Sequence, residues 1–202
     1  LLRGEGRFTG DVIFPNQAFG YVLRSPHAFA KINGIDTAKA LAAPGVLAVL
    51  TGADMEADEI GPLPNILPPL PNIDYDQMFV AKRYILATDM ARLAGHEVAF
   101  IVAETLAQAR DAAELVEVDY EPLDALTNSL DVGAGAPRYQ DKSDNLAFDN
   151  NFGDRQATDA AFAGAAHVIK HRLTVNRVAP SPIENRTTNA SYDAGTDRWT
   201  AY

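Results

Sequence analysis

The fold is decided by the stretch Arg24-Ser25-Pro26-His27-Ala28-Phe29-Ala30-Lys31-Ile32, which joins two runs of strand composition. The run before it, residues 19–24, is aromatic and β-branched, and extended structure resumes over residues 30–35. Proline cannot donate a hydrogen bond to a β-ladder, so Pro26 interrupts the strand. The sequence therefore predicts a strand, a bend and a second strand, and the rest of the chain is interpreted around that bend.

A short helix and a buried strand follow the bend. Asp36 is a suitable N-cap for a helix over residues 37–43, and Pro44-Gly45 ends it. Residues 46–51 are almost entirely apolar, as expected for a strand buried on both faces, and residues 52–54 are predicted to form a turn.

The same order of elements occurs again later in the chain. Residues 98–103 are an apolar run, Thr105 and Gln108 match a capping box, and residues 116–120 alternate as in a half-exposed strand. Two strand–helix–strand units result, at about 31–51 and 98–120, and each implies a parallel or crossover connection. Additional strand-like runs occur at 79–81 and 84–87.

The remaining part of the chain reads as a linker followed by the start of another region. Residues 126–153 are turn-rich and form the candidate linker. We expect a helix over 154–165, a long strand over 168–178, and a hairpin of residues 187–192 with 198–202. Residues 1–18 are expected to be irregular, touching a core through Phe8, Ile13 and Phe14. We expect the chain to be a piece of a longer protein, truncated at both ends.

Composition excludes several classes of function. The chain has 202 residues and a net charge of -10, which argues against binding nucleic acid or an anionic membrane surface. No run approaches the length of a transmembrane helix. Cysteine is absent, which removes disulfides, thiolate metal ligands, iron–sulfur ligation and a cysteine nucleophile from this span, and fits a cytoplasmic location.

The candidate chemical groups are isolated from one another. His167 and His171 have the four-residue spacing of helical metal ligands, but their surroundings favour a strand and no third ligand is near. His27 and His96 lie beside turns, where a single histidine usually has a structural role. Ser181, like the serine of the bend, precedes a proline and lacks the Gly-x-Ser-x-Gly context of a nucleophile.

Two further features keep a functional and a structural interpretation open. Glu184 and Arg186 follow two prolines, so they either form a local ion pair or lie in a rigid loop lining a cavity. Residues 55–78 hold five of the twelve prolines, so this segment is either a solvated insertion or a contact surface for a partner. No phosphate-binding glycine motif is present. We therefore assign no catalytic, cofactor-binding or metal-binding residue to this span.

Five blocks of residues resemble, in order, the start of the large subunit of the molybdenum hydroxylases, the xanthine dehydrogenase, aldehyde oxidase and carbon monoxide dehydrogenase family. The bend block is extended by Ile35-Asp36, Pro44-Gly45-Val46 and Thr51-Gly52-x-Asp54. The other blocks are Leu2-x-Gly4-x-Gly6-Arg7-Phe8-Thr9-Gly10-Asp11, Gly95-His96-Glu97-Val98-Ala99-Phe100-Ile101-Val102-Ala103-Glu104-Thr105, Val118-Asp119-Tyr120-Glu121-Pro122-Leu123 and Asn176-Arg177-x-x-Pro180-x-Pro182-Ile183-Glu184-x-Arg186.

The resemblance implies an α+β fold, with residues 1–125 as an α/β-hammerhead domain and 154–202 as the truncated start of the molybdopterin-binding domain. It implies an oxidoreductase that hydroxylates aldehydes or N-heterocycles, or oxidises CO, with oxygen from water. Molybdopterin would be bound outside this span, and iron–sulfur centres and FAD would lie on partner domains or subunits of an oligomer. The substrate determinants would also lie outside the span.

Two functions follow as alternatives. In the first, the chain is a scaffold and interface part of such an enzyme, inactive by itself, with an apolar surface where the remainder of the large subunit docks. In the second, it is a free-standing, non-catalytic protein-binding module with residues 55–78 as its recognition loop. The parent sequence after Tyr202 distinguishes the two.

Overall fold

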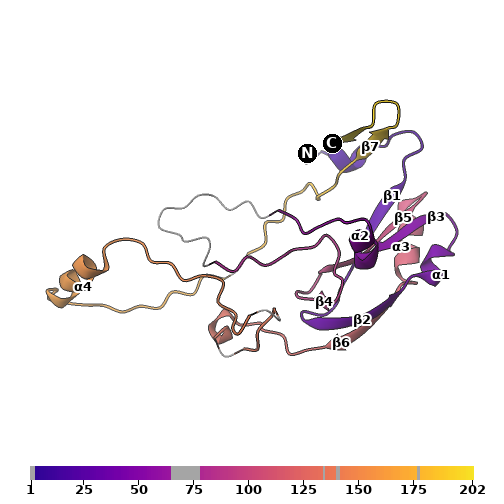
Figure 1. Cartoon of the computed structure of the whole chain (residues 1–202). Helices are drawn as coiled ribbons and strands as arrows, with labels where there is room; N and C mark the ends of the chain where they lie inside the picture. Colours follow the sequence, from indigo (N-terminus) through magenta and orange to yellow (C-terminus); the bar gives the residue numbers. More distant parts are fainter. Residues whose placement is uncertain (1–2, 65–77, 134, 140–141, 177) are drawn as a thin grey trace. The chain divides into compact units, whose positions relative to one another are not determined.

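A computed structural model describes residues 3–64, 78–133, 135–139, 142–176 and 178–202. The chain forms two compact units (Figure 1), one of residues 18–153 and one of residues 1–17 together with 154–202. The predicted boundaries at residues 125 and 153 remain predictions. Most of the predicted proline-rich loop, 55–78, lies outside the described residues, so its role also remains a prediction.

Two three-stranded sheets build the unit of residues 18–153. Within each sheet the neighbouring strands are antiparallel, and β2 and β6 run side by side in Figure 1. One sheet has the order β1 (Phe19–Arg24), β5 (Glu97–Ala103), β3 (Val46–Thr51), and the other β4 (Met90–Ala91), β2 (Ala30–Asp36), β6 (Glu117–Pro122).

Each helix of a strand–helix–strand unit joins strands of different sheets. The helix α1 (Ala38–Leu41) leads from β2 to β3, and α3 (Leu106–Ala113) leads from β5 back to β6. The predicted parallel connection within one sheet is therefore wrong. Hydrophobic patterns identify the strands and helices, but they do not say which strand pairs with which.

The strand β5 contributes to two hydrophobic cores. Its residues Ala99, Ile101 and Ala103 are fully buried against α3, whose own buried residues are three alanines. Small side chains on both elements allow the helix to approach the sheet closely. On its other face, Val98 is fully buried and packs with Ile32 of β2. This dual role explains why the run is apolar on both faces.

The predicted start of α3 is confirmed. The Thr105 hydroxyl accepts a hydrogen bond from the Gln108 backbone N–H at 3.2 Å. The side chain of Gln108 then lies over Gly45, where an added Cβ would be 2.1 Å from Nε2. Because Gly45 also has φ +75°, glycine is required there by both backbone conformation and space.

Two local predictions in this unit are wrong. Residues 52–54 begin the helix α2 (Gly52–Ala57), since Thr51 donates both its N–H and its hydroxyl to Asp54 Oδ2 at 2.7 Å. The strand-like runs 79–81 and 84–87 have no strand structure, because neither pairs with a neighbouring strand. A 3-10 turn, η3 (Ser129–Asp131), lies in the predicted linker.

The second unit is small. It contains η1 (Thr9–Asp11), α4 (Arg155–Ala163) and the predicted C-terminal hairpin, observed as β7 (Ala190–Asp193) paired with β8 (Arg198–Ala201). The buried Asn189 donates through Nδ2 to the carbonyls of Thr9 and Val12, both at 3.0 Å. These bonds join the start of the chain to the hairpin.

Two predictions in this unit are also wrong. The described residues of the predicted strand 168–178 have no strand structure, since no neighbouring strand in the described chain pairs with them. Ile13, predicted to touch a core, is 68% exposed. Of its predicted companions, Phe8 is partly buried and Phe14 contacts the ring of Tyr202 at 5.5 Å between centroids.

Candidate functional site

The bend between β1 and β2 is bonded to the turn before β5. The Ser25 N–H donates to the carbonyl of His96, and the Gly95 N–H donates to the carbonyl of Ser25, both at 2.8 Å. Ser25 is 3% exposed. We call this contact between residues 24–27 and 95–97 the bend junction.

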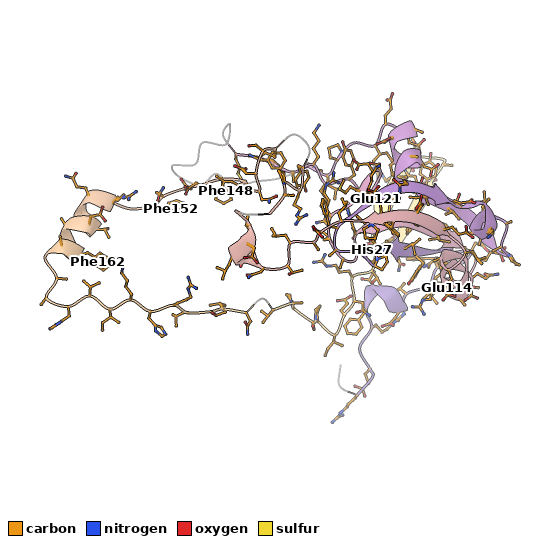
Figure 2. The ribbon with its side chains drawn as sticks, turned by 90° about the horizontal axis from the view of Figure 1, so that it is seen from below. His27, Glu114, Glu121, Phe148, Phe152 and Phe162 are labelled. Atoms are coloured by element: carbon orange, nitrogen blue, oxygen red, sulfur yellow. The ribbon has the colours of Figure 1, made fainter. Side chains whose placement is uncertain are left out.

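The serine and the histidine of the bend do not form a nucleophile–base pair. The Ser25 hydroxyl accepts from the His27 backbone N–H at 3.1 Å and donates to the His27 carbonyl at 3.2 Å. The imidazole of His27 instead lies edge-on to the ring of Tyr120, with 4.9 Å between centroids. Burial raises the pKa of Tyr120, and a hydrogen bond with Ser25 opposes that rise. These residues anchor the bend beside the sheet (Figure 2).

Arg24 completes the bend junction. Its Nη1 lies 2.8 Å from the Gly95 carbonyl and 2.7 Å from Glu97 Oε1. Burial works to raise the pKa of Glu97, but a backbone hydrogen bond and Arg24 outweigh it, so this pKa lies below its ordinary value. The arginine thus neutralises a partly buried carboxylate at the start of β5, which is a structural role.

The other sequence candidates lie apart from one another. His167 and His171 are exposed, in a segment without regular structure, so their spacing does not place them on one face of a helix. No group of three or more His, Asp or Glu side chains suitable for a metal ion occurs among the described residues. Glu184 Oε1 accepts from the Thr9 N–H at 3.3 Å, and no ion pair joins Glu184 to Arg186.

Sequence reasoning missed two adjacent hollows in the unit of residues 18–153. The smaller, of about 300 Å³, is mainly apolar and includes Leu126, Val132 and Leu146 in its lining. The larger, of about 580 Å³, is lined by Lys82, Arg83, Tyr84, Arg92, His96 and others. Both share Phe79, Ala81 and Tyr139. The available signal was the run of basic and aromatic residues after the proline-rich segment, between residues 79 and 92.

Basic side chains stack on aromatic rings around these hollows. Arg92 lies 4.9 Å above the Tyr139 ring, and Lys142 lies 5.4 Å from the Phe79 ring. Asn145 Nδ2 donates to the carbonyls of Val132, Gly135 and Ala136 at 3.1–3.2 Å. These contacts hold the walls in place, so the hollows are formed by ordered side chains and backbone.

Residues 3–124 match the sequence profile of the family described as aldehyde oxidase and xanthine dehydrogenase, a/b hammerhead domain. The chain belongs to this family. The predicted α+β hammerhead fold is therefore confirmed. No helix among the described residues is long and apolar enough to span a membrane.

Relatives extend the similarity over almost the whole chain. The large chain of carbon monoxide dehydrogenase from Afipia carboxidovorans is 37% identical over 95% of this chain and 24% of its own length. The nicotine 6-hydroxylase large subunit from Paenarthrobacter nicotinovorans is 34% identical over 98% of this chain and 23% of its own. This hammerhead protein thus spans about a quarter of the length of these relatives.

Solved structures show the same fold. The crystal structure of the Cu,Mo-CO dehydrogenase matches 99% of this chain and 25% of its own, with a TM-score of 0.81 and 36% identity. Quinoline 2-oxidoreductase from Pseudomonas putida 86 matches the same shares with a TM-score of 0.81 and 29% identity.

The described residues do not fit a molybdenum–pterin group. Thiolates are absent from the chain, and the described histidines and carboxylates do not converge on a metal-sized site. We therefore derive no step of chemistry through such a group on this chain.

Proposed function

We propose that this chain is the N-terminal scaffold of a molybdenum-hydroxylase large subunit, an oxidoreductase that hydroxylates aldehydes or N-heterocycles or oxidises CO with oxygen from water. Molybdopterin would be bound by the remainder of the large subunit, and iron–sulfur centres and FAD by partner subunits or domains of a cytoplasmic oligomer. The share of the relatives' length that the chain spans supports this proposal.

One observation carries the proposal: a long apolar segment has no core to enter. Every described residue from 151 to 188 is exposed. Its apolar side chains reach high exposed fractions: Ile169 90%, Val175 90%, Val178 89% and Leu173 79%. A folded protein rarely leaves so many large apolar side chains in water. The remainder of the large subunit is the surface that would cover them.

The helix α4 fits the same role. It begins at an Asp154 cap, whose Oδ1 accepts from the Ala157 N–H at 2.9 Å, so its start is well formed. None of its residues is buried, and Phe162, labelled in Figure 2, is 60% exposed. A nine-residue helix is marginal in water without tertiary packing. Docking onto the remainder of the subunit would supply that packing.

Limited trypsin digestion tests this proposal. In residues 1–202 expressed alone, we expect rapid cleavage after Lys170 and Arg172, which lie in the exposed segment. In the complete polypeptide the same bonds would be buried and resist cleavage. Lys31 is the matched control, because its side chain is exposed but its backbone is paired within β2, so it should resist in both. Equal cleavage of the segment in both proteins would contradict docking.

A further inference from the structure

The larger hollow of the unit of residues 18–153 concentrates positive charge in a chain of net charge -10. Lys82, Arg83 and Arg92 line it, together with the carboxylates of Glu56 and Asp89. Lys82 and Arg83 form no ion pair with any residue that the structure describes. Two cations therefore face the hollow without a counterion in the described chain.

Arg92 adds an unused hydrogen-bond donor. Its Nε is buried and has no partner among the described residues, although Nη1 lies 3.7 Å from Asp89. Its guanidinium is held above the Tyr139 ring. A buried donor without an acceptor is unusual in a folded protein, and it indicates an incomplete polar site.

His96 supplies a second donor. Its Nδ1 accepts a hydrogen bond from the Arg92 backbone N–H at 3.1 Å. Burial lowers the pKa of His96, so the ring is neutral near pH 7 and its proton is on Nε2. The residue lines the hollow as a neutral donor, which adds hydrogen bonding without adding charge.

We propose that this hollow binds a carboxylate carried on an apolar body. The three cations exceed the two carboxylates by one charge, which matches a monoanion better than a phosphate dianion. Arginine and lysine donors bind carboxylates through charge-assisted hydrogen bonds. Phe79, Tyr84 and Leu93 supply apolar wall, and the volume of about 580 Å³ lies within the range of small-ligand sites.

The carboxylate has two possible sources, a free small molecule or an acidic side chain of another polypeptide segment. Benzoate is the probe for the first, measured by saturation-transfer NMR on the complete polypeptide that carries residues 1–202. Benzamide is the neutral control of the same shape. We expect benzoate to bind with a Kd on the order of 1 mM and benzamide not to bind.

Exposed residues make the variants safe for folding. Arg83→Ala and Lys82→Ala should each weaken benzoate binding about tenfold, since each removes a charged donor. Arg110→Ala on α3 is the matched control, because Arg110 is equally exposed and lies outside the hollow, and it should leave binding unchanged.

Carbodiimide cross-linking, which joins an amine only to a carboxylate in contact with it, tests the second source. Lys39 is the positive control, because it is hydrogen-bonded to Glu117. A cross-link from Lys82 to an acidic residue of another segment or subunit would identify a polypeptide carboxylate.

The proposal is overturned if benzoate and benzamide behave alike and Lys82 gives no such cross-link. It is also overturned if Lys82 cross-links only to Glu56 or Asp89, since the cations would then be neutralised within the hollow. The hollow lies entirely within residues 56–139, so these outcomes are independent of whether molybdenum is present.

Discussion

Arg24 Nη1 lies 2.7 Å from Glu97 Oε1 and 2.8 Å from the carbonyl of Gly95, so one guanidinium ties the end of β1 to the start of β5. These two strands are neighbours in the first sheet, and their register shifts between Leu23 and Arg24. The arginine therefore holds the strands together where their regular pairing is disrupted.

Replacing this arginine should destabilise the fold modestly. Arg24→Ala removes an ion pair and a hydrogen bond to a backbone carbonyl, with an expected loss of about 0.5–1.5 kcal/mol in the free energy of unfolding. Urea denaturation near pH 7 measures it. Lys31→Ala is the control, because its pair with Glu121 is exposed on both sides and 3.7 Å long. An equal loss in both variants would contradict a special role for Arg24.

The effect of Arg24→Ala should also depend on pH. Because the pKa of Glu97 is lowered in the folded state, its ionised form stabilises the protein above the ordinary carboxyl pKa. This stabilisation is lost as the pH falls through the folded-state value. The difference between wild type and Arg24→Ala should therefore shrink between about pH 5 and pH 3. A difference that stays constant over this window would show that Glu97 does not contribute.

The hydroxyl of Ser25 should matter more than that of an exposed serine before proline. Ser25→Ala leaves the N–H of His27 without its acceptor in a buried position, which should cost about 1–3 kcal/mol. Ser181→Ala removes an exposed hydroxyl with a 3.5 Å contact, so it should change stability by less than about 0.5 kcal/mol. Thermal unfolding of the two variants tests the difference; similar melting temperatures would contradict it.

Gly20 should be intolerant of a side chain because of Phe100. An added Cβ would lie 2.3 Å from the tip of the Phe100 ring, so Gly20→Ala should cost about 1–3 kcal/mol. Removing the ring in Phe100→Leu should reduce that cost, which a double-mutant cycle measures. Gly34→Ala in β2 meets nothing within 4 Å and should be nearly neutral. Additive effects of Gly20→Ala and Phe100→Leu would contradict the contact.

His96 should titrate below its ordinary range. Burial lowers its pKa from 6.5, and Arg92 and Arg83 add to that effect against the opposing Glu97. The unfolded chain then binds more protons than the folded one just below pH 6.5, so stability should fall as the pH drops through this window. Histidine NMR titration measures the pKa, and Arg83→Ala should raise it. A pKa at or above 6.5 would contradict the geometry.

Sequence patterns predicted the elements better than their partners. The strands β1, β2, β3, β5 and β6 and the helix α3 lie close to the predicted positions, because proline, glycine and capping residues mark their ends. Sheet membership depends on contacts between distant residues, which local patterns do not encode. This is why the crossover between the two sheets was predicted wrongly.

The predicted strand 168–178 failed for a related reason. Its alternating residues have strand propensity, but a strand forms only where a neighbour accepts its hydrogen bonds, and the described chain offers none. The hollow near Arg92 was missed because residues from 56 to 139 meet there. By contrast, the structural role of the bend was predicted correctly from Pro26 and its flanking strands.

The most direct test of the central claim is to isolate the native protein with antibodies against this chain and measure its intact mass and molybdenum content together. The account predicts a polypeptide about four times as long as this chain, co-purifying with molybdenum and with iron–sulfur and flavin subunits. A polypeptide that ends near residue 202 and carries no molybdenum would contradict it.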